Sequence, residues 1–526
     1  MSSTAVTQGH GAPPARLWDG LRRFEQLPDW LAAAVRPERL RAALTRHVPE
    51  LGEAAGRFVL TGVNASRLRF GHGRWTGRYR LTLTTRDSER GGAAAAAGAA
   101  VRQVELRGSL YPPGALPPCA EETAAGVALG APGWRCRLPE LGLDLEAGDA
   151  ADGDAEGEDA PDAATVATDP ALPALAQLTD PGRARALLER HITAASPAYD
   201  GLRLAGCTPR VVRYKPGSRC TILFDLRYAA PEEATARGWP SLVVAKTYRG
   251  DKGQVAFEGM RALWQSPLGR GDLVTIAEPL AYLPDLRVLL QGPIGEERTL
   301  KDLTRAAVDT GTPAALAVLH GYLAKTAAGL AALHTSGVVI GKPHTLEAEL
   351  AEIRGVLGDL ATAVPDLAGA ADPLLARVEE LAARHPADPP VPSHRSFRPA
   401  QVLLHRGRIG FIDFDGACQA EPALDLALLR ATLKDVGLIR KETDGGGTPP
   451  PRDAQLAVYG QLDRACDAFL ARYQERASVS PLRVLLWETL DVLAYVLRCW
   501  LKVKPERLWA NMLMLERHLA AAGALR

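Results

Sequence analysis

The chain has 526 residues, more than a single compact core normally holds, so two or three domains are expected. Its 47% apolar and 23% charged residues are ordinary for a globular protein. Its net charge of +1 gives no overall attraction to nucleic acid or to an anionic membrane. Basic residues are spread along the chain without the interleaved aromatic residues of a single-strand binder, so neither nucleic acid nor a membrane is expected as a partner.

The seven cysteines are odd in number and form no Cys-x-x-Cys pair, a pattern typical of reduced core thiols. The first residues lack the basic and apolar regions of a secretory signal. No uninterrupted apolar run reaches membrane-spanning length, and the nearest one, 484–497, contains Glu488 and Asp491. Together these features predict a cytoplasmic protein.

A repeat occupies the first half of the chain. Residues 37–48 read PERLRAALTRHV and residues 181–192 read PGRARALLERHI, and the correspondence continues downstream with small insertions. Each copy has the pattern of a helix, a two-stranded hairpin, a further strand, a loop region and a final strand. We therefore predict two copies of an α+β module, at 37–146 and at 179–292, with biased composition as the alternative explanation.

The remaining segments differ in composition from the two copies. Residues 1–36 form an N-terminal arm, and residues 147–178 contain many acidic residues but no Lys or Arg, which predicts a disordered linker. Residues 293–526 have helical spacing, interrupted by a β-hairpin whose tight turn is expected at 406–407. A small β-rich lobe followed by a helical lobe with an internal hairpin is a kinase-like layout.

The strongest motif is HRSFRPAQVLLHRGRIGFIDFDGACQAEPALDLA, residues 394–427. It resembles the aminoglycoside phosphotransferase family, whose relatives include choline kinases and bacterial maltokinases. That family has a loop H-G-D-x-x-x-x-N, a hairpin, a strand end I-D-[FW]-[DGE] and a helix start D-P-x-x-D-L-A. The resemblance covers roughly 180–526. It implies an α+β, bilobal, protein-kinase-like fold with a small β-rich N-lobe and a helical C-lobe, here preceded by a degenerate duplicate of the N-lobe.

The same resemblance implies ATP and Mg²⁺ as cofactors and a small-molecule hydroxyl as acceptor. Lys246, at the end of the strand LVVAKTY, takes the place of the phosphate-binding lysine. Glu258 in the next helix can pair with Lys246, or it lies on a solvated helix face. Gly217 in the turn KPGSRC falls at the nucleotide loop, although one glycine is a weak phosphate cradle, and Gln291 falls at the hinge near the adenine.

For the metal, the resemblance places Asp413 of FIDFDG in the position of the metal-binding aspartate. Asp415 is either a helper or a turn residue. Asp425 corresponds to the structural aspartate that braces the catalytic loop. Gln401 replaces the family's asparagine and can still offer a carbonyl oxygen to Mg²⁺.

The loop departs from the family at its catalytic aspartate, which is replaced by Ser396, while His394 remains. A serine hydroxyl is not basic at neutral pH. Because phosphoryl transfer passes through a loose transition state, the loss of this carboxylate need not abolish the reaction. Two hypotheses follow: a weakened or substrate-assisted kinase, and a pseudokinase that serves as a nucleotide-binding or protein-interaction module.

Arg395 and Arg398 make the loop basic. They either bind an anionic substrate or phosphate, or are ordinary surface arginines. In the first copy of the repeat, alignment of Tyr111 with Tyr248 places Ser109 where the second copy has Lys246. The first copy is therefore interpreted as a cap without a phosphate-binding cation.

Overall fold

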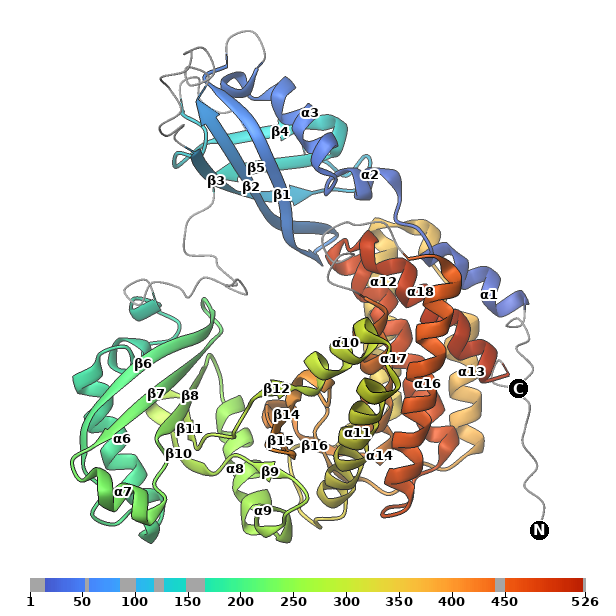
Figure 1. Cartoon of the computed structure of the whole chain (residues 1–526). Helices are drawn as coiled ribbons and strands as arrows, with labels where there is room; N and C mark the ends of the chain where they lie inside the picture. Colours follow the sequence, from blue (N-terminus) through green and yellow to red (C-terminus); the bar gives the residue numbers. More distant parts are fainter. Residues whose placement is uncertain are drawn as a thin grey trace, which may run out of the picture.

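The computed structural model describes residues 15–52, 56–85, 101–117, 127–147, 166–439 and 450–523. Figure 1 shows three bodies, which we name the cap (residues 37–147), the small lobe (166–292) and the helical lobe (293–523). The cap lies against the helical lobe at the top of the view, and the small lobe lies at the lower left. The mixed α+β, bilobal architecture predicted from the sequence is confirmed.

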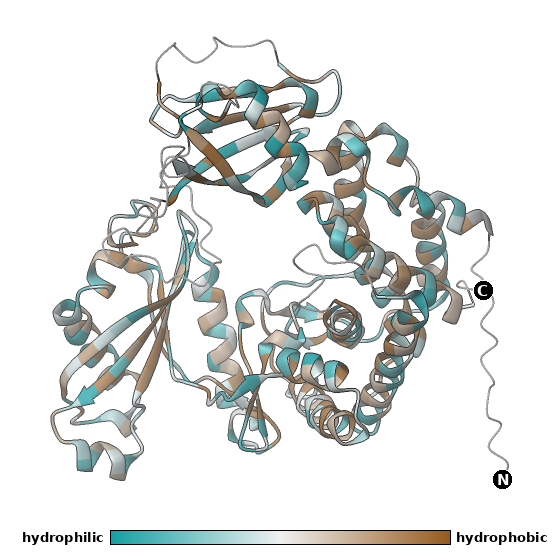
Figure 2. Ribbon diagram, turned by 45° about the horizontal axis from the view of Figure 1, so that its top comes forward, coloured by the Kyte–Doolittle hydropathy of each residue, from teal (hydrophilic) through white to brown (hydrophobic). Residues whose placement is uncertain are grey.

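The cap is a five-stranded antiparallel sheet with strand order β1-β2-β3-β5-β4 and one long helix beside β1. Its strands alternate between buried and exposed residues, because one face packs on the core and the other meets solvent. Brown and teal residues accordingly alternate along these strands in Figure 2. The elements are α3 Pro37–His47, β1 Phe58–Gly71, β2 Arg74–Thr85, β3 Val101–Leu110, β4 Arg135–Leu138 and β5 Leu143–Ala147.

The small lobe has a second five-stranded antiparallel sheet, with order β10-β11-β8-β7-β6. A helix precedes the sheet, another is inserted before β8, and two lie between β8 and β10. The elements are α6 Pro181–Ala195, β6 Leu204–Lys215, β7 Arg219–Tyr228, α7 Pro231–Arg237, β8 Leu242–Tyr248, α8 Lys252–Gln265, α9 Pro267–Arg270, β10 Pro279–Leu283 and β11 Val288–Gln291.

The two sheets share one topology, since β1 to β5 pair in the same order as β6, β7, β8, β10 and β11. The N–H of Tyr111 donates to the turn before β5 at 2.9 Å, and the N–H of Tyr248 donates to the turn before β11 at 3.2 Å. Two residues earlier, Ser109 and Lys246 occupy equivalent places, each paired with the final strand of its sheet. This is the arrangement that a duplication predicts, and a common origin of the two sheets stays a prediction.

The prediction of a disordered linker over residues 147–178 is wrong for the second half of that segment. Val166, Leu172, Leu175 and Leu178 are buried in the core of the small lobe, and the short helix α5 spans Leu175–Leu178. These apolar residues have helical or turn spacing, whereas acidic residues dominate 148–165, which lies outside the described residues. The average composition of 147–178 is dominated by its acidic first half, so it did not indicate that 166–178 is folded.

The helical lobe surrounds a small four-stranded sheet and a two-stranded one. The predicted hairpin is β14–β15, in which His405 pairs with Arg408 across a turn of Arg406 and Gly407, both with positive φ. The helices are α10 Leu300–Thr310, α11 Pro313–His334, α12 Leu346–Ala363, α13 Asp372–Arg384, α14 Pro422–Leu438, α16 Arg452–Gln474, α17 Pro481–Lys502 and α18 Pro505–Ala521. The strands of these two sheets are β12 Arg298–Thr299, β13 Val391–Ser393, β14 Val402–His405, β15 Arg408–Phe411 and β16 Cys418–Ala420, together with β9 Thr275–Ile276, which comes from the small-lobe segment and pairs with β15.

The sequence predicts no apolar run of membrane-spanning length, but helix α11 has such a length and composition. Among the described residues it is the one helix that is long and apolar enough to cross a membrane by length and composition. Half of its most apolar window is buried, and it contacts α10 and α16. A buried core helix passes the same test.

The cap is anchored to the helical lobe through two tryptophans. The indole N–H of Trp75 in β2 donates to the carbonyl oxygen of Trp500 in α17 at 3.0 Å. The indole N–H of Trp500 donates to the carbonyl oxygen of Phe24 at 3.1 Å, between α1 (Ala15–Leu21) and α2 (Asp29–Ala33). The apolar core of the cap is continuous with that of the helical lobe, whereas the sheet and helix α6 of the small lobe have a separate core. The cap and the helical lobe therefore share one packed interior.

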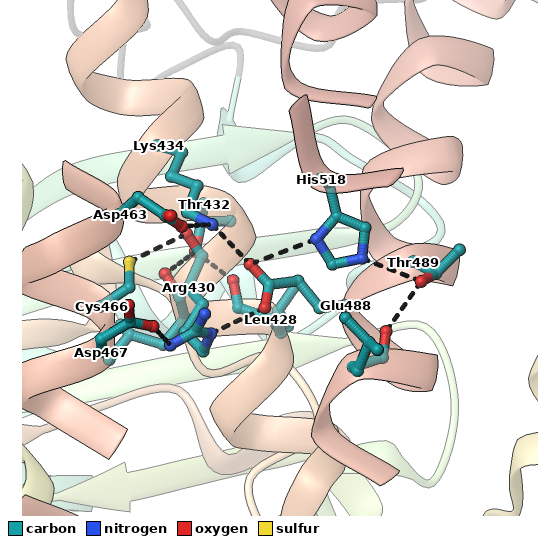
Figure 3. Close-up of polar contacts among 12 residues, drawn as sticks. Leu428, Arg430, Thr432, Lys434, Asp463, Cys466, Asp467, Glu488, Thr489 and His518 are labelled. Atoms are coloured by element: carbon teal, nitrogen blue, oxygen red, sulfur yellow. Dashed lines mark hydrogen bonds and ion pairs between the residues drawn. The ribbon is translucent and has the colours of Figure 1, made fainter. Parts of the chain in front are cut away.

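A buried network of charges joins the C-terminal helices (Figure 3). Glu488 of α17 accepts hydrogen bonds from Arg430 Nε at 2.7 Å and from Lys434 Nζ at 2.9 Å, both on α14. Lys434 also pairs with Asp463 Oδ1 of α16 at 2.6 Å. The side chains of Glu488 and Lys434 are each only 2% exposed. Burial alone would raise the pKa of Glu488, but Arg430 and Lys434 outweigh burial and hold this pKa well below its usual value.

Candidate functional site

A cleft of about 1720 Å³ separates the small lobe from the helical lobe. One wall is made by residues of β6, β7 and β8. The opposite wall is made by the catalytic loop, the end of β15, and residues of α10, α14, α17 and α18. Among the residues proposed from the sequence, those that line the cleft are Lys246, Gln291, Ser396, Arg398, Gln401 and Asp413.

Asp425, at the start of α14, fixes the backbone of the catalytic loop (residues 394–401). Its fully buried carboxylate accepts the N–H of His394 at 2.6 Å and the N–H of Arg395 at 2.8 Å, and it lies 3.2 Å from His334 Nε2. Arg395 has a φ of 64°, a left-handed conformation for which the family has glycine. Two backbone hydrogen bonds to one buried carboxylate fix the strained loop, as the resemblance to the family implied.

His394 and Ser396 form a hydrogen-bonded pair at the base of the cleft. His394 Nε2 lies 2.8 Å from the carbonyl oxygen of Ile412, which can only accept, so Nε2 carries the hydrogen. In the neutral imidazole the opposite nitrogen, Nδ1, is then an acceptor, and it lies 3.2 Å from Ser396 Oγ. The Ser396 hydroxyl therefore donates to a buried imidazole. The sequence placed both residues at the site but did not reveal this pairing, which the spacing i, i+2 in a turn makes possible.

Lys246 bridges the two lobes by ion pairs. Its Nζ lies 2.9 Å from Asp413 Oδ1 and 3.2 Å from Asp415 Oδ1. Burial alone would raise the pKa of Asp413, but the charge and hydrogen bond of Lys246 outweigh it and lower the pKa to about 2. Burial likewise disfavours the Lys246 ammonium, but the two aspartates outweigh it and raise its pKa. Lys246 and Asp413 are thus charged at neutral pH, and Asp415, whose role the sequence left open, belongs to the cluster by its distance from Lys246.

The predicted pair of Lys246 with Glu258 is wrong in this structure. Glu258 is exposed on α8, and its carboxylate accepts from Gln254 Nε2 at 3.0 Å. Helix α8 packs instead with its apolar face toward the turn after Asp413, so Glu258 lies on the solvated face. The alternative that the sequence left open for this residue is the correct one.

Gly217 also differs from its predicted role. Its N–H donates to Asp169 Oδ2 at 2.7 Å, and the Tyr214 hydroxyl donates to the same oxygen at 3.0 Å. This N–H is therefore already bonded and does not face a phosphate. Its neighbours Ser218 and Arg219 line the cleft in its place.

Gln401 does not present an oxygen to a metal ion in this conformation. Its Oε1 accepts the N–H of Arg398 at 3.1 Å, and its Nε2 faces Asp413 Oδ2 at 3.4 Å. Because the backbone N–H requires an acceptor, the amide orientation is fixed by its surroundings. The predicted metal ligand is therefore a group that orients Asp413 through its amide nitrogen.

The carboxylates of Asp413 and Asp415 fit Mg²⁺. This ion prefers hard oxygen ligands and is usually held by one or two carboxylates together with phosphates and water. Across the described ranges, no group of three or more His, Cys, Asp or Glu residues could hold a metal on its own. A two-carboxylate site that is completed by phosphate oxygens agrees with both observations.

The two loop arginines point to different places. The guanidinium group of Arg395 lies 3.2 Å from the carboxylate of Glu352, is exposed, and is not part of the cleft lining. Arg398 is half-buried and lines the cleft two residues beyond Ser396. A substrate role therefore fits Arg398, whereas for Arg395 the interpretation as a surface arginine is the better one.

Residues 237–470 match the family described as "Phosphotransferase enzyme family". Among curated proteins, no sequence matches the chain significantly.

Several solved structures are similar to the chain at low identity. Glucosamine kinase in complex with glucosamine, ADP and inorganic phosphate is 16% identical, with a TM-score of 0.41, covering 93% of this chain and 99% of that one. The ternary complex of streptomycin, ATP and APH(2")-IIa is 13% identical, with a TM-score of 0.38, covering 62% and 97%. A choline/ethanolamine kinase family protein from Mesorhizobium loti is 16% identical, with a TM-score of 0.35, covering 64% and 98%.

The matched segment contains Lys246, the catalytic loop, Asp413 and Asp425, which are the residues that the motif at 394–427 and its strand partner single out. The match of residues 237–470 to the phosphotransferase enzyme family agrees with the resemblance of the catalytic loop.

Proposed function

We propose that the chain is an ATP- and Mg²⁺-dependent phosphotransferase that acts on the hydroxyl group of a small molecule. The observation that carries the proposal is the cluster of Lys246, Asp413 and Asp415 in one cleft with Ser396, whose Oγ lies 3.2 Å from Nδ1 of the buried His394. Phosphoryl transfer needs a cation for the phosphates, carboxylates for the metal and a group that positions the acceptor hydroxyl. The match of residues 237–470 to a phosphotransferase family supports the same reaction class.

Each residue has a defined task in this proposal. Lys246 leaves its ion pairs with Asp413 and Asp415 and binds the phosphates, which frees both carboxylates for the metal. Bound Mg²⁺ neutralises charge on the phosphate oxygens. Gln401 keeps Asp413 oriented through its amide nitrogen. Asp425 holds the loop so that Ser396 faces the cleft.

Ser396 and His394 replace the missing carboxylate. The Ser396 hydroxyl accepts a hydrogen bond from the acceptor hydroxyl and donates its own proton toward His394 Nδ1. The backbone carbonyl of Ile412 fixes the imidazole in the tautomer that can accept this proton. A relay through a neutral hydroxyl is a poorer base than a carboxylate, which supports slow turnover.

The second candidate is a nucleotide-binding pseudokinase that engages a protein partner. Ser396 in place of an aspartate favours it, and so does the cap, whose sheet has Ser109 where the small lobe has Lys246. Both candidates require nucleotide in the cleft, and only the first requires transfer.

We expect Mg·ATP to raise the melting temperature of the wild-type protein, because a ligand at 100 times its Kd stabilises by about 2.7 kcal/mol. Lys246→Ala and Asp413→Ala should each reduce this ATP-dependent shift, measured against the same variant without ATP. Glu258→Ala is the matched control and should keep the full shift, because Glu258 is exposed and pairs with Gln254. A wild-type protein without any Mg·ATP shift would contradict both candidates, and detection of transfer to hydroxyl compounds separates them.

A further inference from the structure

The cleft is far more basic than the chain as a whole. Thirteen Lys and Arg residues line it against four Asp and Glu residues, although the whole chain has a net charge of only +1. A cleft lined by one sign of charge concentrates ligands of the opposite sign. The question is whether the nucleotide accounts for all of this charge.

The cations form two groups on opposite walls. Those of the small lobe lie on β6, β7 and β8 and on the segment from β8 to the start of α8, and they suit a triphosphate. The second group lies on the helical lobe. It consists of Lys301 and Arg305 on α10, Arg398 in the loop, and Arg498, Lys502, Lys504 and Arg507 on or between α17 and α18. We call this second group the basic wall.

The basic wall lines the same cleft as Ser396. Arg398, Tyr495 and Arg498 are all part of that lining. Arg398 is two residues from Ser396 in the same loop, whereas Arg498 comes from α17, one helical turn after Tyr495. Two elements that are far apart in the sequence thus place cations in the cleft that holds Ser396.

Polar atoms without partners lie in the same wall. Asn511 is 2% exposed and uses its Nδ2 to donate to the Tyr495 carbonyl oxygen and to Cys499 Sγ, while its Oδ1 is buried without a hydrogen-bond partner among the described residues. Arg305 Nε is likewise buried and without a partner there. An unsatisfied buried polar group costs roughly 1–3 kcal/mol, which a polar ligand in this part of the cleft would recover. Lys504 has a partner of its own in Glu506, at 3.3 Å.

We propose that the acceptor is an anionic small molecule, a hydroxyl compound that also carries a phosphate or carboxylate group. Its anionic group binds at the basic wall near Arg398 and Arg498, and its hydroxyl lies at Ser396. This inference rests on the proposed phosphotransferase function. A cationic acceptor would meet like charge in this cleft.

The reaction is a transfer of one phosphoryl group. The acceptor oxygen forms a bond to the γ-phosphorus, the bond from that phosphorus to the β–γ bridging oxygen breaks, and ADP leaves. The acceptor proton passes to Ser396 Oγ as the Ser396 proton passes to His394 Nδ1. The anionic group takes no part in the chemistry and fixes the distance from the basic wall to the reacting hydroxyl.

The test uses the full chain saturated with Mg·AMP-PNP, so that the nucleotide part of the cleft is filled. Calorimetric titration with inorganic phosphate, acetate, glucose, glucose 6-phosphate and glucosamine measures binding at the remaining part. We expect phosphate to bind, and glucose 6-phosphate to bind at least about tenfold more tightly than glucose, since a hydrogen bond to a charged group contributes roughly 1.5–3 kcal/mol. Glucosamine should bind no better than glucose. Binding of acetate as well as phosphate identifies a carboxylate as sufficient.

Arg498→Gln should weaken phosphate binding about tenfold or more, whereas Arg476→Gln, an exposed arginine near the end of α16 and outside the cleft, should leave it unchanged. The proposal is overturned if neither phosphate nor acetate binds, or if Arg498→Gln binds phosphate as wild type does. Should Mg·AMP-PNP itself fail to bind, the proposed function fails. Titration of the nucleotide-free protein and of Arg498→Gln with phosphate then still decides whether the basic wall is an anion site.

Discussion

Glu488→Gln is expected to destabilise the helical lobe by about 3–5 kcal/mol, the usual cost of removing one partner from a buried ion pair. Glu488 is the carboxylate that both Arg430 and Lys434 share, and its side chain is 2% exposed (Figure 3). A neutral amide cannot balance two buried cations, although Asp463 and Asp467 keep one contact each with them. Thermal unfolding followed by circular dichroism should show a melting temperature lower by roughly 6 °C or more.

The effect should depend on pH in a defined direction. The folded-state pKa of Glu488 is depressed, so its contribution to stability is complete above the unfolded-state pKa of about 4.3 and is lost progressively as the pH falls below it. The difference between wild type and Glu488→Gln is therefore largest at neutral pH and shrinks in acid.

Glu475→Gln is the matched control for Glu488→Gln. Glu475 pairs with Arg472 at an exposed helix end, where ion pairs contribute about 0–1 kcal/mol. Equal melting temperatures for wild type and Glu488→Gln at pH 7 would contradict the role assigned to the network.

This network also illustrates what the sequence could not predict. Glu488 was visible only as a charge that interrupts an apolar run, because its partners Arg430 and Lys434 lie more than fifty residues away on α14. Periodicity predicted the helices and the hairpin, since these depend on local spacing. Which helix faces pack against one another depends on tertiary structure, and local sequence patterns do not predict it.

At the candidate site, too, the sequence predicted which residues are present but not which contacts they make. The motif at 394–427 placed Ser396 and Asp413 at the site, and the resemblance of the small lobe to the same family placed Lys246 and Gln291 there; all four line the cleft. The errors at Glu258, Gly217 and Gln401 concern contacts that a motif does not encode. Asp169 could not be foreseen as the partner of Gly217, because it comes from a segment with an acidic, linker-like composition.

The basic wall escaped sequence analysis for a related reason. Its cations are separated by long stretches of chain, on α10, in the catalytic loop and on α17 and α18, and none forms a run. Only Arg398 was noticed, because it stands inside the motif. A net charge near zero, taken over 526 residues, conceals a strongly basic cleft.

Ser396→Asp should raise turnover of ATP, with or without an acceptor, by up to ~10²-fold, the lower end of the contribution of a positioned general base. Ser396 lines the cleft and already donates to His394 Nδ1, so a carboxylate at this position faces the acceptor hydroxyl. It can accept the proton directly, in place of the relay through a neutral hydroxyl. Release of ADP measured by a coupled assay reports the rate.

The gain should require Asp413. Without this carboxylate the metal and the γ-phosphate are not held in place, so Ser396→Asp combined with Asp413→Asn should be no faster than Asp413→Asn alone. Ser396→Asn is the uncharged control of the same shape as the aspartate. It should give no gain, because an amide is not a base at neutral pH.

The same substitution decides between the two candidate functions. In a module that only binds nucleotide, a carboxylate at 396 has no proton to accept, and it adds negative charge to a cleft that already holds Asp413 and Asp415. Like charges at close range then weaken nucleotide binding unless Mg²⁺ lies between them. Faster ADP release from Ser396→Asp supports a kinase that is limited by its weak base. An unchanged rate under conditions where Mg·ATP raises the melting temperature would exclude that kinase and leave the nucleotide-binding module, in which His394 and Ser396 only stabilise the loop.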